Sequence, residues 1–176
     1  MYKGIEIISK MLESAHTDAA VFPPTTLYKE GWMLRILLSL QSEGKRGLPF
    51  NLLPGARWFS EGMIGSPFLQ RIRGDSLAEG WTHLDGAIGH FDIRDGTKAG
   101  LVLRPDSKQF VAIEAKMFST LSKGTTHAPN YDQAARIVAC IAWAIKQANR
   151  TAEDFESLGF YVFAPGDQIN RGVFSS

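Results

Sequence analysis

The chain has 176 residues, of which 44% are hydrophobic and 21% are charged, and this globular composition excludes a disordered or fibrous protein. Its formal net charge of +1 means that a polyanionic partner would have to be bound by a local patch. The single cysteine, Cys140, excludes an internal disulfide and a cysteine-rich zinc site. Because no apolar run approaches the ~20 residues that cross a bilayer and the N-terminus lacks the uninterrupted apolar region of a signal peptide, we expect a cytoplasmic protein with no membrane partner.

The first elements along the chain are expected to be helical. Residues 1–24 form an N-terminal helical extension in this interpretation, with a helix from Ile5 to Ala15. A second helix begins after Thr25 or Thr26, either of which can cap it, and its leucines recur at helical spacing until Gly44.

A series of β-rich segments follows the second helix. In chain order these predicted strands are 57–64, 81–94, 101–105, 110–118 and 158–166. An amphipathic helix over 131–149 precedes the last strand, with Ile137, Ile141 and Ile145 at i, i+4 and i+8. Short turns predict antiparallel central strands, and the helix predicts a crossover to a parallel final strand. We therefore expect one α/β domain over residues 1–176, with a mixed central sheet flanked by helices.

The predicted strand over 110–118 carries two opposite charges, Glu114 and Lys116. Because side chains alternate along a strand, the two share one face, about 7 Å apart at their backbones. The simplest interpretation is a weak ion pair on a solvent-facing surface. The opposite face is expected to meet the core, with Val111, Ile113, Ala115 and Met117.

Two further acids precede this pair. Asp85 lies among small and apolar residues on the strand over 81–94. Glu30 lies on the helical stripe that turns toward the sheet, before Met33 and Leu34, although it would also complement the helix dipole in the first turn. Carboxylates that converge on one sheet edge would suit Mg²⁺, which prefers oxygen ligands and can activate water and neutralise charge at phosphorus. A neighbouring lysine would stabilise the developing oxyanion.

Asp85, then Glu114-Ala115-Lys116 on a later strand, then an amphipathic helix, resembles the PD-(D/E)xK nuclease superfamily, the restriction-endonuclease-like fold. The resemblance implies an αβββαβ core over about residues 25–165. It implies that Asp85 and Glu114 bind Mg²⁺ or Mn²⁺ and that Lys116 assists the attacking water. Some members add a glutamate from the first helix to the metal site, and Glu30 corresponds to it here.

The resemblance also implies a role for the helix after the Glu-Ala-Lys motif, where Gln133 resembles a glutamine of some family members. The implied activity is metal-dependent hydrolysis of phosphodiester bonds in DNA, and homodimers are common among such enzymes. The alternative is a catalytically inactive module of the same fold that binds nucleic acid or a protein. Five basic residues before the catalytic strands would suit a phosphate-tracking groove or scattered surface charge: Lys45, Arg46, Arg57, Arg71 and Arg73.

Other acids compete for the aspartate position, because Leu84 and not proline precedes Asp85. Asp92 cannot share a face with Asp85 on a regular strand, since the offset of seven is odd, and a simple three-strand meander would bring Asp92 closer to the level of Glu114. We favour Asp85 for its Asp-Gly-Ala-Ile setting. Asp106, in a literal Pro-Asp pair, is rejected because it lies at a predicted hairpin tip.

Two polar residues near these strands have structural interpretations. Glu61 would be a further acid on the first strand, but a structural role is favoured. His83 is interpreted as a surface or hydrogen-bonding histidine, because the histidines lack the regular spacing of a zinc-binding helix.

Overall fold

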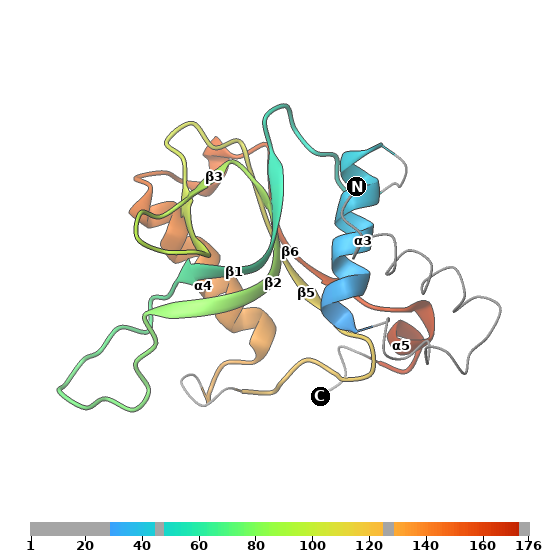
Figure 1. Ribbon diagram of the computed structural model, residues 1–176. Coiled ribbons are helices and arrows are strands. Elements are labelled where there is room, and N and C mark those ends of the chain that lie inside the picture. Colours follow the sequence, from blue (N-terminus) through green and yellow to red (C-terminus); the bar gives the residue numbers. More distant parts are fainter. Residues whose placement is uncertain (1–28, 45–47, 125–128, 173–176) are drawn as a thin grey trace, which may run out of the picture.

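The computed structural model describes residues 29–44, 48–124 and 129–172. In chain order its elements are α3 (Glu30–Ser42), β1 (Arg57–Gly65), β2 (Trp81–Gly89), β3 (Phe91–Ile93), β4 (Gly100–Leu103), β5 (Gln109–Ala115), α4 (Gln133–Gln147), a 3₁₀ turn (Ala152–Asp154), β6 (Ser157–Phe163) and α5 (Gly166–Asn170). The expected α/β class, with a mixed open sheet flanked by helices, is confirmed (Figure 1). Among the described helices, none has the length and apolar character needed to cross a membrane.

The six strands form one sheet in the order β3-β4-β1-β2-β5-β6. The neighbours β1, β2 and β5 are antiparallel, and β6 lies parallel to β5, as the crossover helix predicts. β3 and β4 form an antiparallel hairpin, which joins the outer side of β1 because β4 pairs with β1 in parallel. The chain therefore leaves β2 for one edge of the sheet and returns as β5, which lies between β2 and β6.

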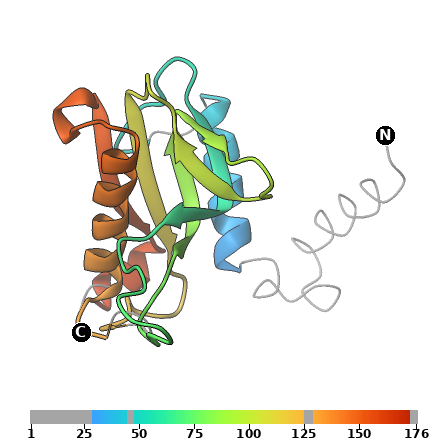
Figure 2. The same ribbon diagram turned by 90° about the vertical axis from the view of Figure 1, so that its left-hand side faces the viewer.

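Helices cover both faces of the sheet, with α3 on one side and α4 on the other (Figure 2). α3 buries Leu34 and Leu38. Asp132 caps α4, because its carboxylate accepts a hydrogen bond of 2.7 Å from the Ala135 N–H. Burial of each large aliphatic side chain contributes about 1.5–3 kcal/mol to stability, so these contacts fix both helices on the sheet. The buried residues of α4 lie at the predicted helical spacing: Ile137, Cys140, Ile141 and Ile145.

β5 is covered on both faces, which corrects the expectation that only one face meets the core. All of its residues are buried. Phe110 and Ala112 belong to the apolar cluster under α4, whereas Val111 and Ile113 belong to the cluster under α3. Glu114 is only 5% exposed and does not lie on a solvent-facing surface. A buried carboxylate requires polar partners or a cation, so this acid needs a structural or functional reason.

Two glycines of β2 permit close packing. A Cβ atom at Gly86 would lie 2.9 Å from a methyl carbon of Leu34, so α3 packs tightly against this strand. Gly89 has a φ of 147°, and a Cβ atom there would lie 2.1 Å from the carbonyl oxygen of Gln109. A side chain at Gly89 would therefore force β2 and β5 apart.

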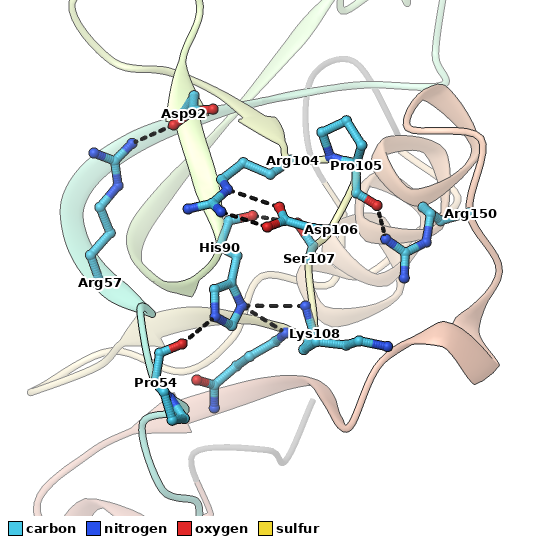
Figure 3. Close-up of polar contacts among 11 residues, drawn as sticks. Pro54, Arg57, His90, Asp92, Arg104, Pro105, Asp106, Ser107, Lys108 and Arg150 are labelled. Atoms are coloured by element: carbon cyan, nitrogen blue, oxygen red, sulfur yellow. Dashed lines mark hydrogen bonds and ion pairs between the residues drawn. The ribbon is translucent and has the colours of Figure 1, made fainter.

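The segment 81–94, expected as a single strand, is divided at His90 into β2 and β3. The buried His90 ring holds this corner (Figure 3). Its Nδ1 accepts hydrogen bonds from the backbone N–H groups of Lys108 (3.3 Å) and Gln109 (3.1 Å), so the ring proton is on Nε2, which donates to the Pro54 carbonyl at 3.0 Å. These bonds direct the chain away from β2 and toward the β3–β4 hairpin.

The start of the first described helix differs from the expected start after Thr25 or Thr26. α3 begins at Glu30, and its N-cap is Lys29, whose side chain makes no capping hydrogen bond. Thr25 and Thr26, and the whole expected extension over 1–24, lie outside the described residues. Helix α5 has no counterpart among the elements expected from the sequence.

Candidate functional site

The candidate site lies where β2 and β5 separate. Their backbone pairing ends at Gly86 and Ile113, and continuing the register by one residue sets Asp85 opposite Glu114. Instead of a further backbone bond, the Asp85 carboxylate accepts a hydrogen bond of 2.8 Å from the Ala115 N–H through Oδ2. Asp85 thus occupies the space between the diverging strands, at the level of the charged end of β5.

Glu114 and Lys116 form a largely buried ion pair, with 2.8 Å between Nζ and Oε1 and side chains that are 6% and 12% exposed. Gln133, the first residue of α4, donates from Nε2 to the same Oε1 at 2.5 Å. The capped end of α4 therefore holds one oxygen of Glu114. The structure brings Asp85, Glu114, Lys116 and Gln133 together.

Glu30 joins the site through the backbone that follows β5. Its Oε1 accepts hydrogen bonds from the Met117 N–H at 2.8 Å and from the Ser119 hydroxyl at 3.5 Å. Because Glu30 is also the acid of the first turn of α3, it complements the helix dipole as well. It fixes the segment beyond Lys116 to the start of α3.

Glu61 and His83 also lie at the site, although only structural roles were expected for them. His83 Nε2 lies 2.8 Å from Glu61 Oε2, and its Nδ1 lies 3.9 Å from Asp85 Oδ1. A guanidinium nitrogen of Arg35, in α3, lies 3.4 Å from Glu61 Oε1. The backbone of Glu61 adopts a left-handed φ of 58°. The hydrogen-bonding role of His83 is as expected. The spacing of His83 and Asp85 was the available signal, since residues two apart share a side of a regular strand.

The electrostatics of the site favour a bound positive charge. Burial raises the pKa of Asp85 above its usual value, despite the opposing effects of the Ala115 N–H, His83 and Lys116, and nearby Glu61 adds to the rise. Burial also raises the pKa of Glu114, and the negative charge of Asp85 adds to this, whereas Lys116 and Gln133 oppose it. A cation between these carboxylates would offset both the burial and the repulsion.

A cavity of about 410 Å³ opens beside Asp85. Its size falls within the roughly 300–1,000 Å³ of small-ligand sites. The lining residues come from the start of α3, from β1 and β2, and from the segment after β5: Lys29, Glu30, Gly31, Glu61, Asp85, Met117 and Phe118.

The donor set suits a cation that keeps part of its water shell. Within the described ranges, no group of three or more His, Cys, Asp or Glu side chains is arranged to hold a metal by itself. Asp85 and Glu114 are two carboxylates, which is the protein contribution that Mg²⁺ often accepts when waters and phosphate oxygens complete its octahedron. The Oε1 atom of Glu30 accepts hydrogen bonds from Met117 and Ser119, and the expected role of Glu30 as a metal ligand stays a prediction.

The competing aspartates lie elsewhere. Asp92 is on β3, which β4, β1 and β2 separate from β5, and its 70% exposed carboxylate lies 3.6 Å from Arg57 (Figure 3). Asp106 follows β4 and binds Arg104 with 2.6 Å between Oδ2 and a guanidinium nitrogen. Neither residue reaches Glu114.

Of the five basic residues considered for a phosphate-tracking groove, the structure describes Arg57, Arg71 and Arg73, and two of these pair with nearby acids. Arg57 pairs with Asp92 and Arg71 pairs with Asp75 at 3.1 Å, so both charges are compensated locally. Lys45 and Arg46 lie outside the described residues.

Comparisons of this chain with protein-family models, with curated proteins and with solved structures gave no match.

Proposed function

We propose that this chain is a magnesium-dependent nuclease of the PD-(D/E)xK type that hydrolyses phosphodiester bonds in DNA. The order α3, β1, β2, β5, α4, β6 supports it, because this is the αβββαβ order of that superfamily once the β3–β4 hairpin is treated as an insertion. The insertion also accounts for the long gap between Asp85 and Glu114.

The observation that carries the proposal is the buried Glu114–Lys116 ion pair beside Asp85. Burial of three charged groups is unfavourable unless they are compensated, and here both acids have raised pKa values. Perturbed acids are enriched at functional sites, and Asp85 also lines the cavity described above, which supports a functional role for this cluster.

Each residue has a distinct role in the proposal. Asp85 and Glu114 hold Mg²⁺ or Mn²⁺, which supplies a Lewis acid and an activated water when bound. Gln133 and Lys116 both contact Oε1 of Glu114, so we expect the cation at the second oxygen. Glu30 supports the site by holding the Met117 backbone.

Lys116 is the residue that we expect to act on the reacting groups. Its ammonium group offers three donors, of which one is used by Glu114 at 2.8 Å. The remaining donors can orient a water molecule and stabilise negative charge on a phosphate oxygen. The 12% exposure of its side chain keeps this interaction in a low dielectric, where it is strong.

The test is cleavage of supercoiled plasmid, linear duplex, single-stranded DNA and RNA by the purified chain in Mg²⁺ and in Mn²⁺. Lys116→Ala should lower the rate about 10²–10³-fold, the usual loss for one donor that stabilises transition-state charge, with an unchanged circular dichroism spectrum. Lys98→Ala, an exposed lysine between β3 and β4, is the control and should keep full activity. Equal rates for wild type and Lys116→Ala, or no metal-dependent cleavage of any substrate, would contradict the proposal.

A further inference from the structure

Phe118 is the most exposed of the large hydrophobic side chains in the described residues, at 75%. It follows Lys116 by two positions and lines the same cavity as Glu30 and Asp85. A single exposed hydrophobic side chain needs no explanation in itself, but the position of this ring beside the charged cavity makes it available to a ligand bound there.

The backbone on both sides of Phe118 is held in place. The Met117 N–H donates to Glu30 Oε1 at 2.8 Å, and the Ser119 carbonyl accepts from Nε2 of Gln168, in α5, at 2.9 Å. Helices α3 and α5 thus fix the two residues that flank the ring. The backbone on either side of Phe118 is therefore held in place, and the exposed ring extends from a fixed position beside the site.

The residues around the Phe118 ring indicate the chemistry of the ligand that could contact it. Its neighbours around the cavity include the acids Glu30, Glu61 and Asp85, so the adjoining surface suits a ligand that combines a metal-bound phosphate with an apolar planar group. A nucleotide has both parts. A base can stack on an aromatic ring only through a free face, because in a duplex both faces are occupied by neighbouring bases.

Resting on the proposed function, we propose that Phe118 stacks on a nucleobase next to the scissile phosphate, so that the preferred substrate is a single strand or a frayed end. Phe118 then selects among nucleic acids, whereas Asp85, Glu114 and Lys116 perform the chemistry. The stack requires only a π face, so it favours unpaired strands without sequence preference.

The experiment measures binding of a fluorescein-labelled oligonucleotide, single-stranded or annealed, by anisotropy with Ca²⁺ in place of Mg²⁺, and a gel confirms that the probe stays intact. The wild type should bind the single strand more tightly than the duplex. Phe118→Ala should weaken single-strand binding about 5- to 150-fold, the loss expected for one base–aromatic stack. Phe118→Trp should restore it, because a larger ring stacks at least as well.

Ile72→Ala is the matched control, because Ile72 is similarly exposed at 72% but lies in the loop between β1 and β2 and should leave affinity unchanged. Equal single-strand affinity for wild type and Phe118→Ala overturns the inference. If Phe118→Ala instead converts a dimer to a monomer in sedimentation, the ring belongs to a homodimer contact, which also overturns it. Cleavage in Mg²⁺ is measured separately. If binding depends on Phe118 but no nucleic acid is cleaved, only the nuclease proposal is refuted. If nucleic acid is cleaved but binding does not depend on Phe118, only the stacking proposal is refuted.

Discussion

Replacing Asp85 by asparagine should make the metal-free protein more stable and remove its response to metal. The substitution keeps the shape of the side chain and an oxygen that can accept from the Ala115 N–H, as Oδ2 does now at 2.8 Å. It removes a negative charge whose side chain is only 23% exposed and which lies near Glu61 and Glu114. A residue selected for stability alone would show the opposite result.

The sign of the pH dependence follows from the raised pKa of Asp85, whose largest cause is burial. A carboxyl group with a raised pKa contributes most to stability while it is protonated, and that contribution is lost as pH rises through its folded-state pKa. Wild type and Asp85→Asn should therefore be similarly stable below the usual pKa of 3.8, and the variant should gain an advantage as pH rises above it. At neutral pH we expect a gain of about 0.5–2 kcal/mol, the range typical of single stabilising substitutions such as those that relieve unfavourable charge.

The assay is thermal and urea unfolding of both proteins in EDTA across this pH range, and again with Mn²⁺ or Mg²⁺. For a chain of this size, 1 kcal/mol corresponds to about 2–4 °C in Tm. Metal at about 100 times its Kd should stabilise the wild type by about 2.7 kcal/mol, and should leave Asp85→Asn unchanged. The reasoning is refuted if the variant is less stable in EDTA at neutral pH, or if metal stabilises both proteins equally.

Two further substitutions test the surroundings of the site. Gln133→Ala removes the 2.5 Å hydrogen bond to Glu114 and should weaken Mn²⁺ binding about 10–100-fold by calorimetry, as for other residues that orient a metal ligand; an unchanged Kd would show that Gln133 does not position the carboxylate. Gly89→Ala should lower the free energy of unfolding by at least about 2 kcal/mol in urea, because its Cβ would meet the Gln109 carbonyl at 2.1 Å. Gly96→Ala is the control for the second variant, since Gly96 also has a positive φ but no atom within 4 Å of the added Cβ, and an equal loss in both variants would rule out crowding as the cause.

The elements beside the site could be predicted from local patterns. Isoleucines at i, i+4 and i+8 correctly predicted α4, and a run of β-forming residues correctly predicted β5. The position of α4 between these strands also predicted that β5 and β6 pair in parallel. The alternation of side chains also predicted that Glu114 and Lys116 lie on one side, where the structure has them paired.

Other features depend on long-range packing and had no local signal. A meander built from consecutive strands brings Asp92 near Glu114, but the β3–β4 hairpin pairs with the far side of β1 and carries Asp92 to the edge. The burial of Glu114 depends on α3 and α4 covering both faces of β5. The left-handed φ of Glu61, which accompanies its approach to His83, is not visible in a pattern of residue types, since non-glycine residues rarely adopt it.

The central claim is that Asp85 and Glu114 share one divalent cation at the end of the β2–β5 pairing. Anomalous diffraction from crystals of the full chain soaked in Mn²⁺ tests it most directly. The account predicts a manganese peak within about 2.0–2.3 Å of an oxygen of each carboxylate, as expected for small divalent cations with oxygen ligands. No peak between the two side chains at a concentration that occupies other sites, or a peak bound by only one of them, would contradict it.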